Sequence, residues 1–185
     1  MFKKFIRKYG YYMAAFALIL VIGLTAGLTN GNQEEEVPNA PTGTTAIEMV
    51  CPMNAAEVLK WYSDTELFYN ATLKQWESHK AVDLTSNTSP DVFAVLDGTV
   101  TDCSYSYEDG YCITISHADG LATTYCSLSN LDAVKKGDSV IRGQKIGEIS
   151  TTATNESVDG SHLHFSVKLN GKNVDPANYI TFENK

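Results

Sequence analysis

The sequence predicts a mainly β fold, because apolar residues alternate in short segments that are separated by turn-forming pairs. These pairs are Asp97-Gly98, Asp109-Gly110, Asp119-Gly120 and Asn170-Gly171, and Asx-Gly between alternating segments is typical of β-hairpins. No helical repeat of useful length follows residue 76. We therefore expect an antiparallel sheet that is closed or sandwiched on itself, preceded by an N-terminal helix.

The expected strands follow the apolar alternation. Residues 91–103 alternate around Phe93, Val95 and Val100, and residues 111–117 alternate around Ile113 and Ile115. A further strand is expected over residues 121–128. Asn170-Gly171, between residues 165–167 and Val174, is the strongest hairpin signal in the chain.

The N-terminal region predicts a membrane anchor. Residues 11–28 are almost entirely apolar, and the first eight residues contain four basic side chains, Lys3, Lys4, Arg7 and Lys8. About 20 apolar residues cross a bilayer as a helix, and flanking basic residues stay in the cytoplasm. We expect a cytoplasmic tail over 1–8 and a transmembrane helix over 9–29, with the rest of the chain extracytoplasmic. A cleaved signal peptide is the alternative.

Three further regions follow the predicted anchor. Residues 30–46 contain three consecutive Glu and two Pro and read as a solvated linker. Residues 47–78 are apolar enough to pack, and we expect a lead-in segment with one strand and a loop lying over the main domain. The main domain is expected over residues 79–185.

The charge of the chain argues against nucleic acid as a partner. The 185 residues include 14 Lys and Arg against 22 Asp and Glu, a formal charge of -8. Without the first eight residues, 10 basic side chains face 22 acidic ones. Phosphate binding needs clustered basic residues, so a metal ion, a cationic ligand or a protein partner fits better.

The four cysteines, Cys51, Cys103, Cys112 and Cys126, allow three complete pairings. If residues 118–120 form a three-residue loop, Cys112 lies opposite Cys126. An extracytoplasmic location permits disulfides, but small buried side chains are an equal alternative. Their spacing does not favour a Cys-rich metal site.

Candidate metal ligands occur in two histidine clusters. These are His79-x-x-x-Asp83 and His162-Leu163-His164. Residues two apart on a strand share a face, so both imidazoles of the second cluster project together while Leu163 and Phe165 enter the core. Two imidazoles and one carboxylate suit a tetrahedral zinc site with an open position for water. His117, at the end of an expected strand, is interpreted as a structural histidine.

These clusters belong to a series of motifs that resembles the LytM-type domain of the M23, or lysostaphin-like, metallopeptidases over residues 79–180. The motifs are His79-x-x-x-Asp83, residues 95–100 (VLDGTV), residues 134–147 (VKKGDSVIRGQKIG), Gly160-x-His162-Leu163-His164-Phe165 and Asn170-Gly171-Lys172-x-Val174-Asp175-Pro176. The resemblance implies an antiparallel β fold with a duplicated hybrid motif. It also implies zinc ligands at His79, Asp83 and His164, with His162 assisting catalysis.

One family position is altered. The family has Tyr-x-His-Leu-Ser where this chain reads Tyr125-Cys126-Ser127-Leu128-Ser129, so Ser127 replaces the second catalytic His. Serine has no pKa near neutrality, and loss of a general acid or base typically lowers the rate by about 10²–10⁴-fold. We therefore expect zinc binding with weak or absent hydrolysis.

A narrower similarity to the stage II sporulation protein Q family rests on the anchor, the acidic linker and two lead-in motifs. The lead-in motifs are Pro52-Met53-x-Ala55-x-Glu57-Val58 and Leu67-x-Tyr69-x-x-Thr72-Leu73-x-x-Trp76-x-x-His79. The similarity implies a forespore membrane protein that pairs with stage III sporulation protein AH of the mother cell during engulfment. An active zinc-dependent peptidoglycan endopeptidase, and a non-catalytic peptidoglycan binder or amidase activator, are the alternatives.

Overall fold

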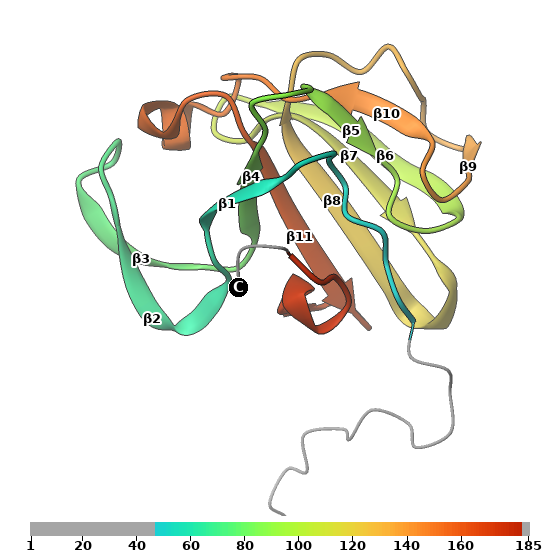
Figure 1. Ribbon diagram of the computed structural model, residues 1–185, viewed down its shortest axis with the longest axis horizontal. Coiled ribbons are helices and arrows are strands. Elements are labelled where there is room, and N and C mark those ends of the chain that lie inside the picture. Colours follow the sequence, from blue (N-terminus) through green and yellow to red (C-terminus); the bar gives the residue numbers. More distant parts are fainter. Residues whose placement is uncertain (1–46, 183–185) are drawn as a thin grey trace, which may run out of the picture. The chain divides into compact units, whose positions relative to one another are not determined.

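The structure is a computed structural model that describes residues 47–182 (Figure 1). Its strands are β1 Glu57–Lys60, β2 Ser63–Asn70, β3 Gln75–His79, β4 Val82–Thr85, β5 Asp91–Phe93, β6 Gly98–Ser106, β7 Gly110–Ser116, β8 Leu121–Leu128, β9 Ser139–Val140, β10 Lys145–Glu148, β11 Leu163–Leu169 and β12 Lys172–Val174. Three short 3-10 helices, η1 Ala118–Gly120, η2 Thr154–Asp159 and η3 Pro176–Asn178, complete the described elements. The predicted mainly β fold is confirmed.

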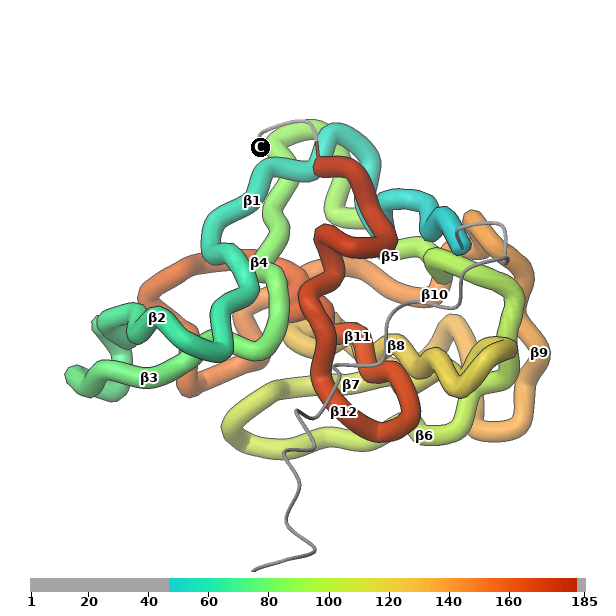
Figure 2. Tube along the Cα trace, turned by 90° about the horizontal axis from the view of Figure 1, so that it is seen from below, coloured from blue at the N-terminus to red at the C-terminus, as the bar shows by residue number. Residues whose placement is uncertain are grey.

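Eight strands form one antiparallel sheet in the order β1-β4-β11-β8-β7-β6-β9, with β12 paired to β11. Strands β5 and β10 form a separate pair, and so do β2 and β3. Figure 1 and Figure 2 both place the β2–β3 hairpin at the opposite end of the molecule from β9. The expected hairpin between β11 and β12 is present. Its turn residues Asn170 and Gly171 have φ of 50° and 80°, which glycine and asparagine tolerate best.

The hydrophobic core lies on one face of the main sheet. Side chains from the central strands alternate into it, and β5, β10, the start of the described chain and its C-terminal end cover it. The fully or almost fully buried members include Val82, Leu84, Val92, Ile113, Ile115, Tyr125, Ile146, Phe165, Met49, Met53, Ile180 and Phe182. Residues that alternate with them point to the opposite face of the sheet.

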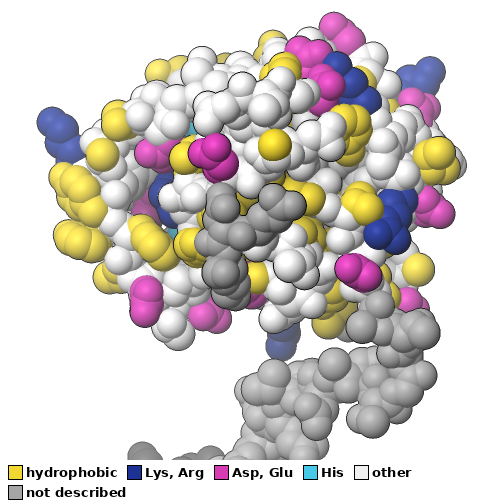
Figure 3. Space-filling model, viewed as in Figure 1, with side chains coloured by type: hydrophobic (Ala, Val, Ile, Leu, Met, Phe, Trp, Pro, Cys, Tyr) yellow, Lys and Arg dark blue, Asp and Glu magenta, His cyan; other side chains and the backbone are white. Residues whose placement is uncertain are grey.

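The lead-in segment differs from the prediction of one strand and a loop. It contains β1, β2 and β3, and the β2–β3 hairpin projects from the main sheet (Figure 1). Large apolar side chains that we expected to pack are exposed: Leu67 by 58%, Tyr69 by 51% and Trp76 by 66%. Apolar side chains gather over this hairpin in Figure 3. Neither face of the hairpin is fully buried, so the apolar content of this segment does not reflect a packed core.

The predicted tail over 1–8, helix over 9–29 and linker over 30–46 lie outside the described residues. Within residues 47–182, none of the helices is long and apolar enough to cross a membrane.

Candidate metal centre

The sheet register places four residues in one row across neighbouring strands. Lys60 on β1 pairs with Asp83 on β4, Asp83 pairs with His164 on β11, and His164 pairs with Cys126 on β8. Val82, Leu84 and Phe165, which flank these positions, enter the core. The row therefore lies on the face of the sheet opposite the core.

His79 reaches the row from the end of β3. Its Nδ1 lies 3.0 Å from the carbonyl oxygen of Trp61. Because a carbonyl only accepts, Nδ1 carries the proton and Nε2 presents a lone pair. Nε2 is buried, makes no hydrogen bond within residues 47–182, and lies 3.2 Å from Asp83 Oδ1. A backbone partner on one ring nitrogen and a free lone pair on the other are typical of a metal-binding histidine.

Glu156 on η2 joins the predicted ligands, although the sequence did not indicate it. It is only 5% exposed, and its Oε2 lies 3.1 Å from His164 Nδ1. Its Oε1 lies 3.8 Å from His79 Nε2. Glu156 lies between the motif that ends at Gly147 and the motif that begins at Gly160, so only the folded structure brings it to the site.

Donor atoms of His79, Asp83, Glu156 and His164 all lie within 4.8 Å of one another. The three predicted ligands are thus brought together, with Glu156 as an unpredicted fourth. Separations such as 2.9 Å between His164 Nδ1 and Asp83 Oδ1 resemble the edges of a zinc tetrahedron, which are about 3.3 Å for bonds of about 2.0–2.1 Å. Nitrogen and carboxylate donors in this arrangement fit zinc.

Lys60 lies against the carboxylates of the cluster. Its Nζ is 3.1 Å from Asp83 Oδ2, 3.0 Å from Glu156 Oε1 and 3.1 Å from Asp159 Oδ2. Burial opposes the charge of the ammonium group, but Asp83 and Glu156 outweigh burial and raise the pKa of Lys60. The ammonium group is therefore a fixed positive charge beside the predicted ligands.

Protonation in the metal-free protein follows from the same contacts. Burial lowers the pKa of His164, but hydrogen bonds to Asp83 and Glu156 outweigh it and raise that pKa to about 10. Burial raises the pKa of both carboxyl groups, but their histidine partners lower it well below the usual range. In the metal-free protein, a proton on His164 thus balances the negative charge of Asp83 and Glu156. A bound metal ion would balance the same charge in its place.

His162 lies just before β11 and is fully buried. Its Nδ1 lies 2.9 Å from the carbonyl oxygen of Gly160, and its Nε2 lies 3.4 Å from Glu156 Oε2. Burial lowers the pKa of His162, but the contact with Glu156 raises it overall. His162 and His164 therefore both approach Glu156, but of these two histidines only His164 belongs to the group of mutually close donors.

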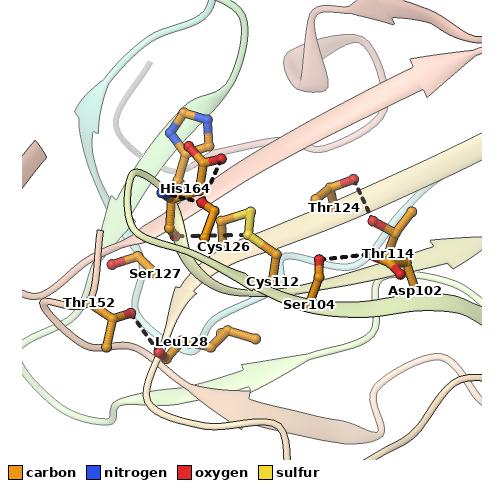
Figure 4. The surroundings of a disulfide bond; sticks show 12 residues. Asp102, Ser104, Cys112, Thr114, Thr124, Cys126, Ser127, Leu128, Thr152 and His164 are labelled. Carbon is orange, nitrogen blue, oxygen red and sulfur yellow. Dashed lines mark hydrogen bonds between the residues drawn. A yellow bond between two sulfur atoms is a disulfide. The ribbon is translucent and has the colours of Figure 1, made fainter. Parts of the chain in front are cut away.

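Ser127 occupies a bulged end of β8. It has φ of 62°, is fully buried, and its Oγ donates to the carbonyl oxygen of Ser150 at 2.9 Å. In Figure 4, Ser127 and His164 lie on different sides of Cys126. The hydroxyl group is thus engaged by the backbone at the position where the family resemblance places a catalytic His.

The structure settles the pairing that the sequence left open: Cys112 and Cys126 form a disulfide, with a Cα–Cα distance of 4.2 Å. It joins β7 to β8 beside His164 (Figure 4).

His117 lies outside the centre. Its Nδ1 is 2.8 Å from the carbonyl oxygen of Asp97 and its Nε2 is 2.7 Å from Thr123 Oγ1, so its interpretation as a structural histidine is confirmed.

Comparison with known proteins identifies the class. A family model described as peptidase family M23 matches residues 77–176, and the chain belongs to this family. It is 35% identical over 114 residues to stage II sporulation protein Q of Bacillus subtilis, covering 60% of this chain and 38% of that protein. It is also 31% identical over 102 residues to the peptidoglycan DD-endopeptidase ShyC of Vibrio cholerae, covering 55% of this chain and 23% of ShyC.

A solved structure supports the sporulation similarity. A chain in the structure of the SpoIIQ-SpoIIIAH pore forming complex matches with a TM-score of 0.63 and 28% identity, over 74% of this chain and 92% of that chain. The present chain spans less than two fifths of the length of the two curated relatives.

Proposed function

We propose that this chain is a membrane-anchored, extracytoplasmic zinc-binding domain of the M23 family that acts by binding a partner protein and hydrolyses peptidoglycan weakly or not at all. The observation that carries the proposal is Ser127. It replaces a catalytic His of the family resemblance, and its buried hydroxyl group is held by the carbonyl oxygen of Ser150.

The predicted zinc ligands and Ser127 concern different requirements of hydrolysis. His79, Asp83 and His164 would hold zinc, which in this family of sites lowers the pKa of a bound water and polarises a carbonyl. Hydrolysis also requires groups that move protons at the reacting atoms. Ser127 has no pKa near neutrality, so it cannot replace an imidazole as general acid or base, and the expected loss is about 10²–10⁴-fold.

The proposed partner is a protein similar to stage III sporulation protein AH. Support comes from the 35% identity to stage II sporulation protein Q and from the match to the solved SpoIIQ-SpoIIIAH complex. An anchor over residues 9–29 would place the domain in the intermembrane space of a sporulating cell, where such a partner is reached from the opposite membrane.

Co-purification and peptidoglycan digestion together test the proposal. The full-length chain in detergent should retain an AH-like protein from the same organism and should contain about one zinc per chain. Cross-linked peptidoglycan incubated with the same sample should release no muropeptides, while an active M23 endopeptidase releases them in parallel. Failure to retain the AH-like protein would count against the partner role.

An active endopeptidase is the second candidate. His162 and the three predicted ligands are all present, and the similarity to ShyC favours this function. Zinc-dependent release of muropeptides that is lost in His164→Ala would establish it and would show that another group replaces the missing His.

A further inference from the structure

The position of Glu156 has a consequence for the kind of zinc site that this chain can form. A hydrolytic zinc site has three protein ligands and leaves the fourth position to water, whereas a structural site is closed by four protein ligands. His79, Asp83 and His164 would leave that position open. Glu156 brings a further carboxylate oxygen to the same cluster, 3.1 Å from His164 Nδ1 and within the group of mutually close donors.

The two carboxylates are oriented alike around the cluster. Asp83 Oδ1 and Glu156 Oε2 face His164 Nδ1 at 2.9 and 3.1 Å. Their other oxygens, Asp83 Oδ2 and Glu156 Oε1, face Lys60 Nζ at 3.1 and 3.0 Å. Lys60 therefore binds the outer oxygen of each carboxylate and leaves the inner oxygen directed at the centre, as outer contacts do in built metal sites.

The helix that carries Glu156 is fixed by contacts on both sides. Asn70 Nδ2 donates to the carbonyl oxygen of Asn155 at 3.0 Å, and the amide of Val158 donates to Thr72 Oγ1 at 3.2 Å. On the other side, Thr154 Oγ1 donates to the carbonyl oxygen of Tyr107 at 2.6 Å. The inward position of Glu156 is thus determined by packing of η2 and not only by its own side-chain contacts.

We propose that Glu156 is the fourth zinc ligand of this chain, so that protein donors close the coordination shell and no position remains for water. The inference rests on the zinc site of the proposed function but not on the partner. It provides a reason for weak hydrolysis that is independent of Ser127.

Cobalt substitution tests this proposal directly, because the visible spectrum of Co²⁺ reports coordination number and the entry of an external ligand. Full-length wild-type chain loaded with Co²⁺ should show an intense four-coordinate spectrum that azide does not change. In Glu156→Ala, azide should change the spectrum. Zinc affinity, measured by competition with a chromophoric chelator, should fall by about 10-fold or more, since even outer contacts are worth about 10–100-fold.

Val158→Ala is the matched control. Val158 lies on the same helix, is 65% exposed and is outside the donor group, so the zinc affinity and the Co²⁺ spectrum of this variant should match those of the wild type. A wild-type Co²⁺ spectrum that azide alters would overturn the closed site without requiring any variant to fold, while leaving a zinc-binding partner protein intact. Absence of metal binding by the wild type would overturn the zinc site of the proposed function as well.

Discussion

Asp83 contacts His164 and Lys60 through different oxygens. Its Oδ1 lies 2.9 Å from His164 Nδ1, while its Oδ2 lies 3.1 Å from Lys60 Nζ. The side chain is fully buried, so it has lost its hydration and depends on these partners to stay ionised. The carboxylate is therefore stable only while cations or donors surround it.

Removal of the ammonium group should reveal this dependence. Lys60→Met keeps an unbranched side chain as far as the ε position but leaves Asp83 and Glu156 without their shared cation. Loss of one partner of a buried ion pair typically costs about 3–5 kcal/mol, and we expect about 2–3 kcal/mol here because the Lys60 side chain is 17% exposed. Urea unfolding in EDTA should show this loss in the free energy of unfolding.

Zinc should reduce the effect of Lys60→Met, because a bound divalent cation stabilises the same carboxylates. Lys145→Met provides a matched control: its Nζ forms ion pairs with Asp91 and Glu148 on the surface, and exposed pairs contribute about 0–1 kcal/mol. Equal losses for the two variants in EDTA would contradict the role assigned to Lys60.

His117 predicts a pH dependence that is separate from the metal centre. Burial lowers the pKa of His117 below 6.5, so the unfolded chain binds its proton more strongly than the folded chain. The free energy of unfolding should therefore fall as the pH drops below about 6.5, and this loss should level off below the folded-state pKa. His117→Gln should be less stable at pH 7 but should show a flatter profile in chemical unfolding between pH 7 and 5. An identical slope in both proteins would refute this assignment.

The residues of the site that could be predicted from the sequence are those that occur in motifs with a recognisable spacing. His79 and Asp83, four residues apart, and His164 on an expected strand could be identified from their motifs. Glu156 could not, because its position depends on contacts of η2 with Asn70, Thr72 and Tyr107, which lie 47 or more residues away in the sequence. The sequence therefore indicated three of the four clustered donors, but it could not indicate Glu156.

At the scale of elements, the β2–β3 hairpin and η2 form one supporting unit for the metal centre. The sequence predicted the strands of the main sheet well, since residues 121–128 coincide with β8 and their apolar alternation reflects a single buried face. It failed for the hairpin because Leu67, Tyr69 and Trp76 remain exposed. In the sequence, exposed apolar residues look the same as buried ones. Only the folded structure, which shows what packs against each strand, distinguishes an exposed hairpin from a packed segment.

Asn70→Ala should separate the hairpin from η2. Asn70 is only 6% exposed. Its Oδ1 accepts from the amides of Thr72 and Leu73, and its Nδ2 donates to Glu77 and to the carbonyl oxygen of Asn155. Loss of these bonds should cost about 1–3 kcal/mol locally. Hydrogen exchange should then accelerate at the amides of residues 72, 73 and 154–159.

The central sheet should keep its protection in Asn70→Ala, because β7 and β8 are joined by their own ladder and by the Cys112–Cys126 disulfide. Thr65→Ala, an exposed change on the same hairpin, should leave exchange in η2 unchanged. Uniform acceleration across the main sheet would mean that Asn70 supports global stability and not the attachment of η2.

At the scale of the whole molecule, the metal centre connects parts of the chain that are far apart in sequence. His79 ends β3, Asp83 lies on β4, Glu156 on η2 and His164 on β11. A ligand that binds only the folded state stabilises it by mass action, by about 2.7 kcal/mol at a free concentration of 100 times Kd. Because these elements separate on unfolding, zinc should stabilise the described domain as a unit.

Zinc removal should therefore lower the melting temperature of the full chain by about 10 °C, from that stabilisation and the unfolding entropy of a domain of this size. Calorimetry with excess zinc and with EDTA measures the difference. His79→Ala removes a ligand whose Nδ1 is already held by Trp61, so it should melt at the same lower temperature in both buffers and retain no zinc after dialysis. A wild-type melting temperature that does not respond to zinc would mean that the four donors form an ion-pair network without metal, in which Lys60 and a proton on His164 balance the charge of the carboxylates.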